Sequence, residues 1–388
     1  MSPASWVRSC LWWTLSLLVG LGIGTPLVAQ QAGPVGLPAG TLAKPRQAAA
    51  DFLRTTQADD GHWSDYPGPA ITGIVTKSLL DAGVDPVDPM IQKALAYLKQ
   101  ALQPDGGIYT KENKVSNYET SVALLAFAAA NRDGQYDTLI ANARDFLKKL
   151  QWDETEGLSV DDPRYGGGGY GRSERPDLSN TSFLLEALKA AGVPENDESM
   201  KKVVIFLSRC QNLESEHNTT EFASKINDGG FYYTPAGGGN SQAGTDANGG
   251  LRSYASMTYA GLKSMIYAGV GPDDPRVKAA MEWLKKHYTL AENPGMGQKG
   301  LYYYYHTFAK ALAVAKIDLM VDAKRVAHDW RRELGEHLIA KQRDNGSWIN
   351  TDSGWLEGDP NLVTAYALMA LKYCETPATN PGRAAGGQ

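Results

Sequence analysis

Among the Asp, Glu and His residues of this chain of 388 residues, Asp177 and His306 are the clearest candidates for acid–base chemistry. Asp177 opens the segment Asp-Leu-Ser-Asn-Thr directly before an apolar run, where a carboxyl is either a buried Brønsted acid or a helix cap. His306 follows the four tyrosines Tyr302–Tyr305, where a histidine is either a base or a hydrogen-bonded residue at a cavity rim. Both residues are therefore weak catalytic candidates.

No other pattern predicts a catalyst or a cofactor site. No Cys/His spacing is that of a zinc ribbon or finger, and no Gly-x-Ser-x-Gly segment offers a nucleophile. The glycine run at 166–171 lacks the strand and the lysine of a phosphate-binding loop. We expect no metal and no cofactor. Cys210 and Cys374 fall in different predicted helices, so two buried free thiols are expected, with a disulfide as the alternative in an exported chain.

A repeated unit must position these side chains. The pattern Gln-x-Asp-x-Gly-x-aromatic occurs at Gln57–Trp63, Gln103–Tyr109 and Gln342–Trp348, and looser copies begin at Gln151 and Gln211. Returns at intervals of about 45–70 residues are typical of a repeat protein. Each unit reads as an amphipathic outer helix, a glycine–aromatic turn and a more apolar inner helix. We expect the inner helices to begin near Thr72, Tyr118, Asn180, Arg252, Tyr304 and Asn361.

The first and last units carry the best copies of the motif, which favours a closed ring. An open solenoid would have atypical polar units at its ends. Inner helices without a polar face must also be covered on several sides. The sequence therefore predicts an all-α fold, an α6/α6 toroid of six inner and six outer helices over residues 42–375.

The two ends of the chain differ in composition from this domain. Residues 1–29 contain one cation, Arg8, then a short apolar run and a small-residue cleavage point, which predicts a signal peptide; an uncleaved anchor is the alternative. Residues 30–41 and 376–388 are rich in Pro, Gly and Ala and are expected to be disordered. We therefore expect export to the periplasm, the cell envelope or the medium, with membrane contact only through the signal segment.

The repeated motif resembles the QW repeats of squalene–hopene and oxidosqualene cyclases and of their prenyltransferase β-subunit relatives. The resemblance covers about Ala48–Glu375. It implies a structural role, in which the glutamine ties a helix end and the aromatic side chain stacks on it. On this interpretation the scaffold residues are Gln57, Trp63, Gln103, Tyr109, Gln342 and Trp348.

The active-site motifs of those families are incomplete here. The Asp-x-Asp-Asp-Thr acid motif of the cyclases corresponds to Asp177–Thr181, with Ser179 and Asn180 in place of the second and third aspartates. A serine hydroxyl cannot protonate an alkene. The zinc site of the prenyltransferases corresponds to His306 alone, because the chain has no Asp-x-Cys pair and reads Leu251–Tyr254 where one is expected. The resemblance thus implies the fold without either known chemistry.

Three functions follow. The first is a non-catalytic or divergent toroid that binds a hydrophobic or amphipathic ligand, for which tyrosine offers both a ring face and a hydroxyl. The second is a terpene cyclase with a non-standard acid: Asp177, Asp65 or Glu119. The third is a polysaccharide lyase or hydrolase, which would need a Tyr/His base with Arg252 or a carboxylate pair. The expected rim of the cavity is Tyr66, Tyr118, Asp177, Asn180, Arg252, Tyr254, Tyr304, His306 and Asn361.

The partners expected are therefore a lipid, an isoprenoid or a glycan. A net charge of −5 and a pI near 5.8 give no basic face, so nucleic acid is not expected as a partner. Two convergent carboxylates in the cavity would favour the enzymes over the binding protein. The polarity of the cavity would separate isoprenoid from glycan ligands. The sequence leaves the oligomeric state open.

Overall fold

The computed structural model describes residues 34–66, 68–172 and 175–377. The chain divides into Met1–Pro34 and a second unit that begins at Val35, and this second unit is described here. The predicted signal peptide lies outside the described residues and stays a prediction. Within the described part of the chain, no helix is both long and apolar enough to cross a membrane.

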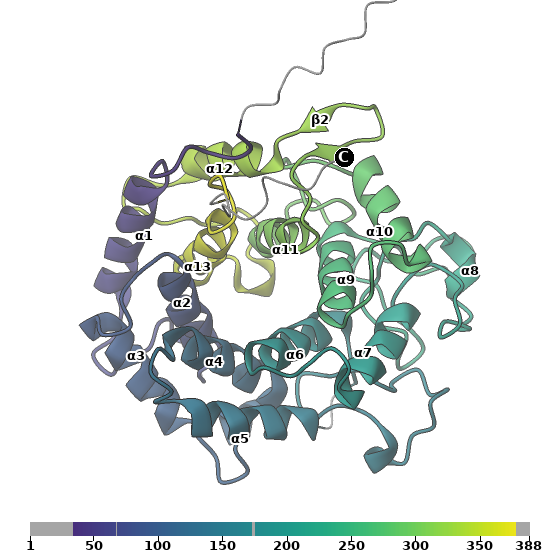
Figure 1. Cartoon of the computed structure of the whole chain (residues 1–388), viewed down its shortest axis with the longest axis horizontal. Coiled ribbons are helices and arrows are strands. Elements are labelled where there is room, and N and C mark those ends of the chain that lie inside the picture. The colour runs from purple at the N-terminus through teal and green to yellow at the C-terminus, as the bar shows by residue number, and fades with distance from the viewer. Residues whose placement is uncertain (1–33, 67, 173–174, 378–388) are drawn as a thin grey trace, which may run out of the picture. The chain divides into compact units, whose positions relative to one another are not determined.

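Six inner helices form a closed ring in the order of the sequence. Each contacts the next one along the chain, and the last contacts the first, as Figure 1 shows. They are α2 (Ala70–Asp81), α4 (Ser116–Ala130), α6 (Leu178–Ala190), α9 (Ala255–Tyr267), α11 (Leu301–Val314) and α13 (Pro360–Leu371). The predicted all-α toroid is confirmed, and each inner helix begins within a few residues of its predicted start.

Six outer helices surround this ring (Figure 1). They are α1 (Ala43–Thr56), α3 (Pro89–Gln100), α5 (Asp137–Lys148), α7 (Glu198–Arg209), α10 (Pro275–Lys286) and α12 (Trp330–Lys341). The connections add the short helix α8 (Ala223–Ile226), the strands β1 (Met320–Val321) and β2 (Ala327–His328), and three turns of 3-10 helix at Lys111–Asn113, Glu154–Glu156 and Gly354–Leu356. The two-residue strands were not predicted, because so short a segment has no periodicity.

The glutamine of the first and last copies of the motif links its unit to the next outer helix. The side-chain amide of Gln57 donates to Gly61 O at 3.0 Å in its own turn and to Met90 O at 2.9 Å in α3. In the last unit, Gln342 donates to Gly346 O at 2.8 Å and to Pro45 O at 2.9 Å in α1. Since Pro45 belongs to the first outer helix, this second hydrogen bond helps to close the ring.

The glycine and the tryptophan of the last unit explain the rest of the motif. Gly346 has φ = +87°, and a Cβ atom there would lie 2.2 Å from Ala48 O of the first outer helix, so only glycine fits. Trp348 is fully buried. Its Nε1 donates to Leu338 O at 2.8 Å and its backbone N–H to Thr364 Oγ1 at 3.1 Å, which joins the turn to both helices of the unit.

The second copy of the motif departs from this scheme. The side chain of Gln103 donates to Tyr109 O at 2.9 Å in its own hairpin rather than to the next outer helix. Ile108, and not Tyr109, takes the place of the tryptophan, because it is buried and its N–H donates to Thr120 Oγ1 at 3.0 Å. The left-handed glycine, Gly106, lies one residue closer to the glutamine than in the first copy. Gln103 and Tyr109 thus make structural contacts, but in other positions than the corresponding residues of the first and last copies.

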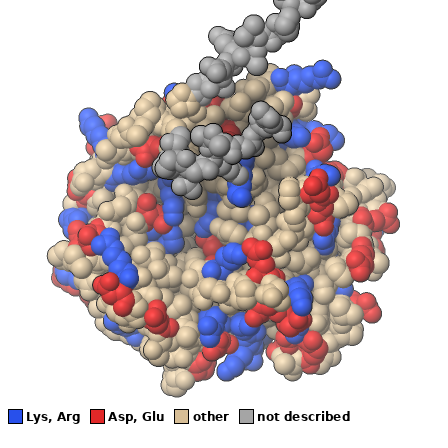
Figure 2. Space-filling model, viewed as in Figure 1, with Lys and Arg blue, Asp and Glu red and all other residues tan. Residues whose placement is uncertain are grey.

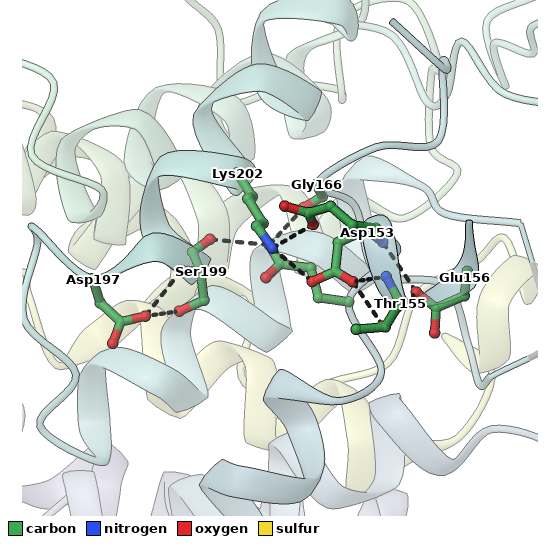
Figure 3. A network of polar contacts seen from close by, with 9 residues as sticks. Asp153, Thr155, Glu156, Gly166, Asp197, Ser199 and Lys202 are labelled. Carbon is green, nitrogen blue, oxygen red and sulfur yellow. Dashed lines mark hydrogen bonds and ion pairs between the residues drawn. The ribbon is translucent and has the colours of Figure 1, made fainter. Parts of the chain in front are cut away.

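The third unit is tied to the fourth by a polar network on the outside of the ring (Figure 3). Asp153 accepts hydrogen bonds from Thr155 N at 2.8 Å and from Lys202 Nζ of α7, also at 2.8 Å. Glu154 accepts a second hydrogen bond from the same ammonium group at 2.6 Å. Asp197 caps α7 by accepting from Ser199 N at 2.9 Å. In this network two carboxylates share one lysine.

The predicted boundaries at 42 and 375 need correction. Leu37 is buried, and its N–H donates to Cys374 O at 2.9 Å. Thr376 N donates to Leu37 O at 2.9 Å, and Gly36 N to Asp329 Oδ2 at 2.8 Å. Residues 35–41 and 376–377 are therefore ordered by mutual pairing, whereas 30–33 and 378–388 lie outside the described residues. Cys210 and Cys374 are buried and free, as predicted.

Candidate ligand cavity

A cavity of about 320 Å³ lies at the end of the ring where the inner helices begin. It is lined by Tyr66, Ala70, Ile71, Val115, Tyr118, Tyr170, Ser179, Asn180, Phe183, Tyr233, Gln242, Tyr254, Ser256, Met257, Tyr303, Trp355, Leu356, Glu357, Leu362 and Tyr366. All six inner helices contribute a residue from their first turns or from the segment just before them. The ring thus positions one shared site, as the repeat predicted.

Aromatic side chains dominate this lining. Phe183 packs edge-on against Tyr118, with ring centroids 5.2 Å apart, and faces Tyr303 at 6.3 Å. The Tyr303 hydroxyl lies 3.1 Å from Ser179 Oγ, so a hydrogen bond joins α11 to α6 across the ring. Burial raises the pKa of Tyr118 and of Tyr303 far above the ordinary value. These phenols are therefore neutral and can only donate or accept hydrogen bonds.

Asp177 is a helix cap. One carboxylate oxygen accepts from Asn180 N at 2.9 Å and the other from Asn180 Nδ2 at 2.7 Å, at the N-terminus of α6. Burial raises the pKa of Asp177 to about 6, against the hydrogen bonds from Asn180, which lower it. Asp177 does not line the cavity, whereas Ser179 and Asn180 do. Of the two roles expected for Asp177, buried acid or helix cap, the structure shows the helix cap.

Four of the predicted rim residues line the cavity: Tyr66, Tyr118, Asn180 and Tyr254. The prediction was wrong for Tyr304 and His306, because these residues lie on other faces or turns of α11 than the one that borders the cavity. Tyr304 points outward, with its hydroxyl donating to Thr289 O at 2.6 Å, and Tyr303 faces the cavity in its place. His306 lies one turn deeper than Tyr303 and stacks on Tyr366 at 6.0 Å, outside the lining.

Arg252 and Asn361 also lie outside the lining. Arg252 precedes α9 rather than beginning it, and its exposed guanidinium donates to Thr245 O at 3.1 Å. Asn361 is used to join the last unit to the first: its Nδ2 donates to Ser64 Oγ at 3.1 Å, and its Oδ1 accepts from Thr56 Oγ1 at 2.7 Å. The side-chain amide of Asn361, which was expected to face a ligand, therefore forms hydrogen bonds that close the ring.

Glu357 is the one carboxylate among the lining residues that the structure describes, and it was not predicted. It caps α11 from another unit by accepting from Tyr302 N at 3.2 Å and Tyr303 N at 2.8 Å, and Asn350 Nδ2 donates to it at 2.6 Å. Burial raises its pKa. Its two partners in α11 lie about 55 positions earlier in the chain, so no local spacing could have indicated that contact.

Trp355 and Leu356 form an apolar rim that the sequence also did not indicate. Both have positive φ, +53° and +66°, in a region that non-glycine residues rarely adopt. Their side chains are 50% and 44% exposed, yet both line the cavity. The indole of Trp355 lies against Gly300, where an added Cβ would come within 3.0 Å of the ring. Strain held beside a cavity is a feature of functional loops.

Metal ligands do not gather in the described part of the chain, which contains no group of three or more His, Cys, Asp or Glu side chains able to hold an ion. His328 is the most heavily contacted histidine, with Nδ1 2.9 Å from Glu333 Oε1 and Nε2 3.4 Å from Asp322 Oδ2. These contacts join β2 to α12 at the outer edge of the ring.

Comparison with known proteins shows which folds this chain resembles. Residues 46–234 match the family model of the squalene-hopene cyclase C-terminal domain. The solved structure of the type II terpene cyclase MstE from Scytonema in its apo form has a TM-score of 0.52 and 15% identity, covering 85% of this chain and 97% of that one. A variant of that enzyme, also apo, has a TM-score of 0.53 at 16% identity, with 86% and 96% covered.

Another variant, in complex with geranylgeranyl dihydroxybenzoate as substrate, has a TM-score of 0.51 at 15% identity and covers 86% and 97% of the two chains. No curated protein matches the sequence. The protein is therefore a terpene cyclase-like α/α toroid. At these identities the similarity to MstE concerns the fold alone.

Proposed function

We propose that the cavity binds an uncharged apolar or amphipathic molecule of the isoprenoid class and does not cyclise it by protonation. The observation that carries this proposal is the residue at the acid position, Ser179. The cavity has one carboxylate among its described lining residues, Glu357, and this group already accepts three hydrogen bonds. No Lys, Arg or His is among the described lining residues, so an anionic group would find no counter-ion there.

The size and the surface of the cavity favour a hydrocarbon chain with a small polar end. A volume of about 320 Å³ is at the lower end of the range for small-molecule sites. Tyr118, Phe183, Tyr303 and Trp355 supply ring faces, while Ser179 supplies a hydroxyl near the centre of the ring.

The ligand class has one further support. MstE was crystallised with geranylgeranyl dihydroxybenzoate, an aromatic acid that carries an isoprenoid chain. Because the identity to MstE is 15%, we extend to this chain only the class of ligand and not the reaction.

The alternative of a terpene cyclase with a non-standard acid depends on Asp177, whose raised pKa would suit a proton donor. Both of its oxygens are bound by Asn180, however, and Asp177, Asp65 and Glu119 are all outside the lining. The lyase or hydrolase alternative requires two carboxylates or Arg252 beside the ligand. With Glu357 alone in the lining, neither arrangement is present among the described residues.

The test is chemical analysis of the full-length protein purified from its own source. We expect native mass spectrometry to detect a bound, uncharged lipid, and incubation with squalene or oxidosqualene followed by gas chromatography to give no cyclised product. Cyclised product from the unmodified protein that is lost in Asp177→Asn would overturn the proposal and establish the acid. A bound sugar would instead favour the glycan alternative.

The exported location remains part of this proposal. The signal peptide at 1–29 lies outside the described residues, so cleavage after Ala29 is a prediction. Cell fractionation and N-terminal sequencing of the mature protein would test it, and a retained Met1 in the membrane fraction would favour the anchor.

A further inference from the structure

A second set of polar side chains lies on the inner helices, beyond the cavity and toward their C-terminal ends. This set, called here the lysine cluster, consists of Lys77 and Asp81 in α2, Glu186 in α6, Lys263 in α9, Lys310 in α11, and Lys372 directly after α13. Half of these side chains are buried: the exposed fraction is 4% for Lys263 and Glu186 and 9% for Lys310. The cluster is therefore inside the ring rather than on its outer surface.

Each of the two carboxylates in the cluster binds two lysines. Glu186 accepts from Lys263 Nζ at 2.9 Å and also forms an ion pair with Lys310. Asp81 accepts from Lys372 Nζ at 2.8 Å and also forms an ion pair with Lys77. The ion pairs of these four lysines with described residues involve no other carboxylate.

The lysine cluster therefore has more positive than negative charge. With all groups ionised, four ammonium groups face two carboxylates. Burial lowers the pKa of Lys77, the adjacent Asp81 opposes this effect, and the charge of Lys310 lowers the pKa further. The two halves of the cluster therefore lie close enough to interact. Excess charge in a poorly hydrated interior is costly unless it is paired. The partial negative charge at the helix C-termini offsets only part of it.

His306 adds an unsatisfied polar atom at the same place. Its Nδ1 is buried and has no hydrogen-bond partner among the described residues, and the side chain is 2% exposed. Burial, and then the charge of Lys310, lower the pKa of His306 to about 3, so the ring is neutral. Neutral imidazole carries an N–H on one of its two nitrogens, and in one tautomer Nδ1 is a donor. In that tautomer His306 adds to the cluster a donor without an acceptor.

The lysine cluster has a route to solvent. Lys372 is 39% exposed and Lys77 is 13% exposed, whereas Lys263 and Lys310 lie deeper. On the face shown in Figure 2, Lys and Arg side chains lie within the hollow at the centre of the ring. An ion that entered from this side would meet the partly exposed lysines before the buried ones.

We propose that the lysine cluster is a binding site for an oxyanion with two negative charges, of the chemistry of a phosphate monoester. Two negative charges would balance the excess of two ammonium groups, and the phosphate oxygens accept the hydrogen bonds for which Lys77, Lys263 and His306 have donors to spare. The carboxylates of Asp81 and Glu186 keep the lysines apart and oriented. This site is separate from the aromatic cavity, and its occupancy does not depend on the function proposed for that cavity.

The experiment is isothermal titration of the full-length protein with inorganic phosphate at about pH 8, where phosphate is mostly dianionic, with chloride holding the ionic strength constant. In the variant Lys77→Met/Lys263→Met each carboxylate keeps one lysine, and the net charge of the cluster is zero. Affinity for phosphate should fall about tenfold or more in this variant, because charge-assisted hydrogen bonds are lost. The single variant Lys372→Met, at the partly exposed edge, should weaken binding less and gives a second test if the double variant does not fold.

The matched control is Lys202→Met, which removes a lysine that two carboxylates already balance and should leave phosphate binding unchanged. Titration with a short-chain phosphatidate distinguishes the source of the anion: tighter binding than phosphate indicates a lipid headgroup, and equal binding indicates free phosphate. An unmodified protein that binds phosphate no better than the Lys77→Met/Lys263→Met variant would overturn the proposal.

Discussion

Two carboxyl groups on the same helix, Asp177 at the start of α6 and Glu186 near its end, have opposite electrostatic environments. Both are almost completely buried. Burial raises the pKa of Asp177 to about 6, although Asn180 donates two hydrogen bonds to it. The pKa of Glu186 lies well below its ordinary value, because Lys263 and Lys310 outweigh the same effect of burial. Burial alone therefore does not decide the charge of an inner-helix carboxyl.

This contrast extends to the whole ring. The end where the inner helices begin is aromatic and nearly free of charge, and the other end concentrates lysines around two carboxylates. The two sites that we propose therefore lie toward opposite ends of the inner helices. The outer network around Lys202 shows the opposite balance, with one lysine for two carboxylates, and it needs no further ion.

The largest effect is expected from Glu186→Gln, which leaves Lys263 and Lys310 buried without a carboxylate. Breaking a buried ion pair on one side should lower the free energy of unfolding by about 3–5 kcal/mol at neutral pH. Urea denaturation measures this loss. Because the folded pKa of Glu186 is depressed, its stabilising contribution is present above about pH 4 and is lost as the pH falls further. The surface variant Glu154→Gln is the control and should leave the urea midpoint nearly unchanged, so an equal shift in both variants would contradict the contrast between the two networks.

A loss of comparable size is expected from Trp348→Ala, which removes a fully buried indole at the ring closure. We expect a decrease of roughly 3–5 kcal/mol in the free energy of unfolding. Since the closure holds both ends of the ring, ligand binding at the aromatic end and phosphate binding at the lysine end should weaken together. Thermal denaturation with both titrations tests this. An unchanged melting temperature with loss of one ligand would place Trp348 in a binding site instead.

A smaller, pH-dependent effect is expected from Asp177→Asn. The folded state binds the Asp177 proton more tightly than the unfolded state, whose carboxyl has a pKa of about 3.9. The stability that protonation provides is therefore present below about pH 4 and is lost as the pH rises through about 6. Asparagine is also a good cap, so the variant should match the native protein at low pH and exceed it at pH about 8. Parallel melting curves across this range for both proteins would contradict the raised pKa.

The smallest effect is expected from Tyr303→Phe, which removes the hydroxyl that reaches Ser179 but keeps the ring. The loss of one hydrogen bond should cost about 0.5–1.5 kcal/mol. Tyr304→Phe is the matched control on the adjacent residue, whose hydroxyl bonds to Thr289 O outside the cavity. Both variants should lose similar stability, whereas Tyr303→Phe alone should change the affinity for an amphipathic ligand, as measured by fluorescence of the nearby Trp355.

The fold was predictable because its determinants are local and repeated. Gln57 and Gln342 make equivalent contacts in two different units, and the apolar runs of the inner helices gave their positions. The positions in the second unit could not be predicted, because Gly106 lies one residue closer to Gln103 than Gly61 does to Gln57. A spacing pattern with two adjacent glycines does not show which of them has the left-handed conformation.

The site was predictable only in part because it depends on rotation and on distant contacts. A helix turns about 100° per residue. The prediction chose Tyr304, whereas the neighbouring Tyr303 is the residue that faces the cavity. Glu357 caps α11 from another unit, and the lysine cluster unites four inner helices and the residue that follows a fifth. Neither arrangement leaves a signal in the spacing of nearby residues.

The most direct test of the central claim, that one ring has an apolar site and a cationic site at its two ends, is hydrogen–deuterium exchange with mass spectrometry. An uncharged isoprenoid alcohol should protect the first turns of the inner helices, including peptides over 115–120 and 178–183. Inorganic phosphate should protect the last turns, including peptides over 77–84 and 310–316. Protection of the same peptides by both compounds, or by neither, would contradict the account.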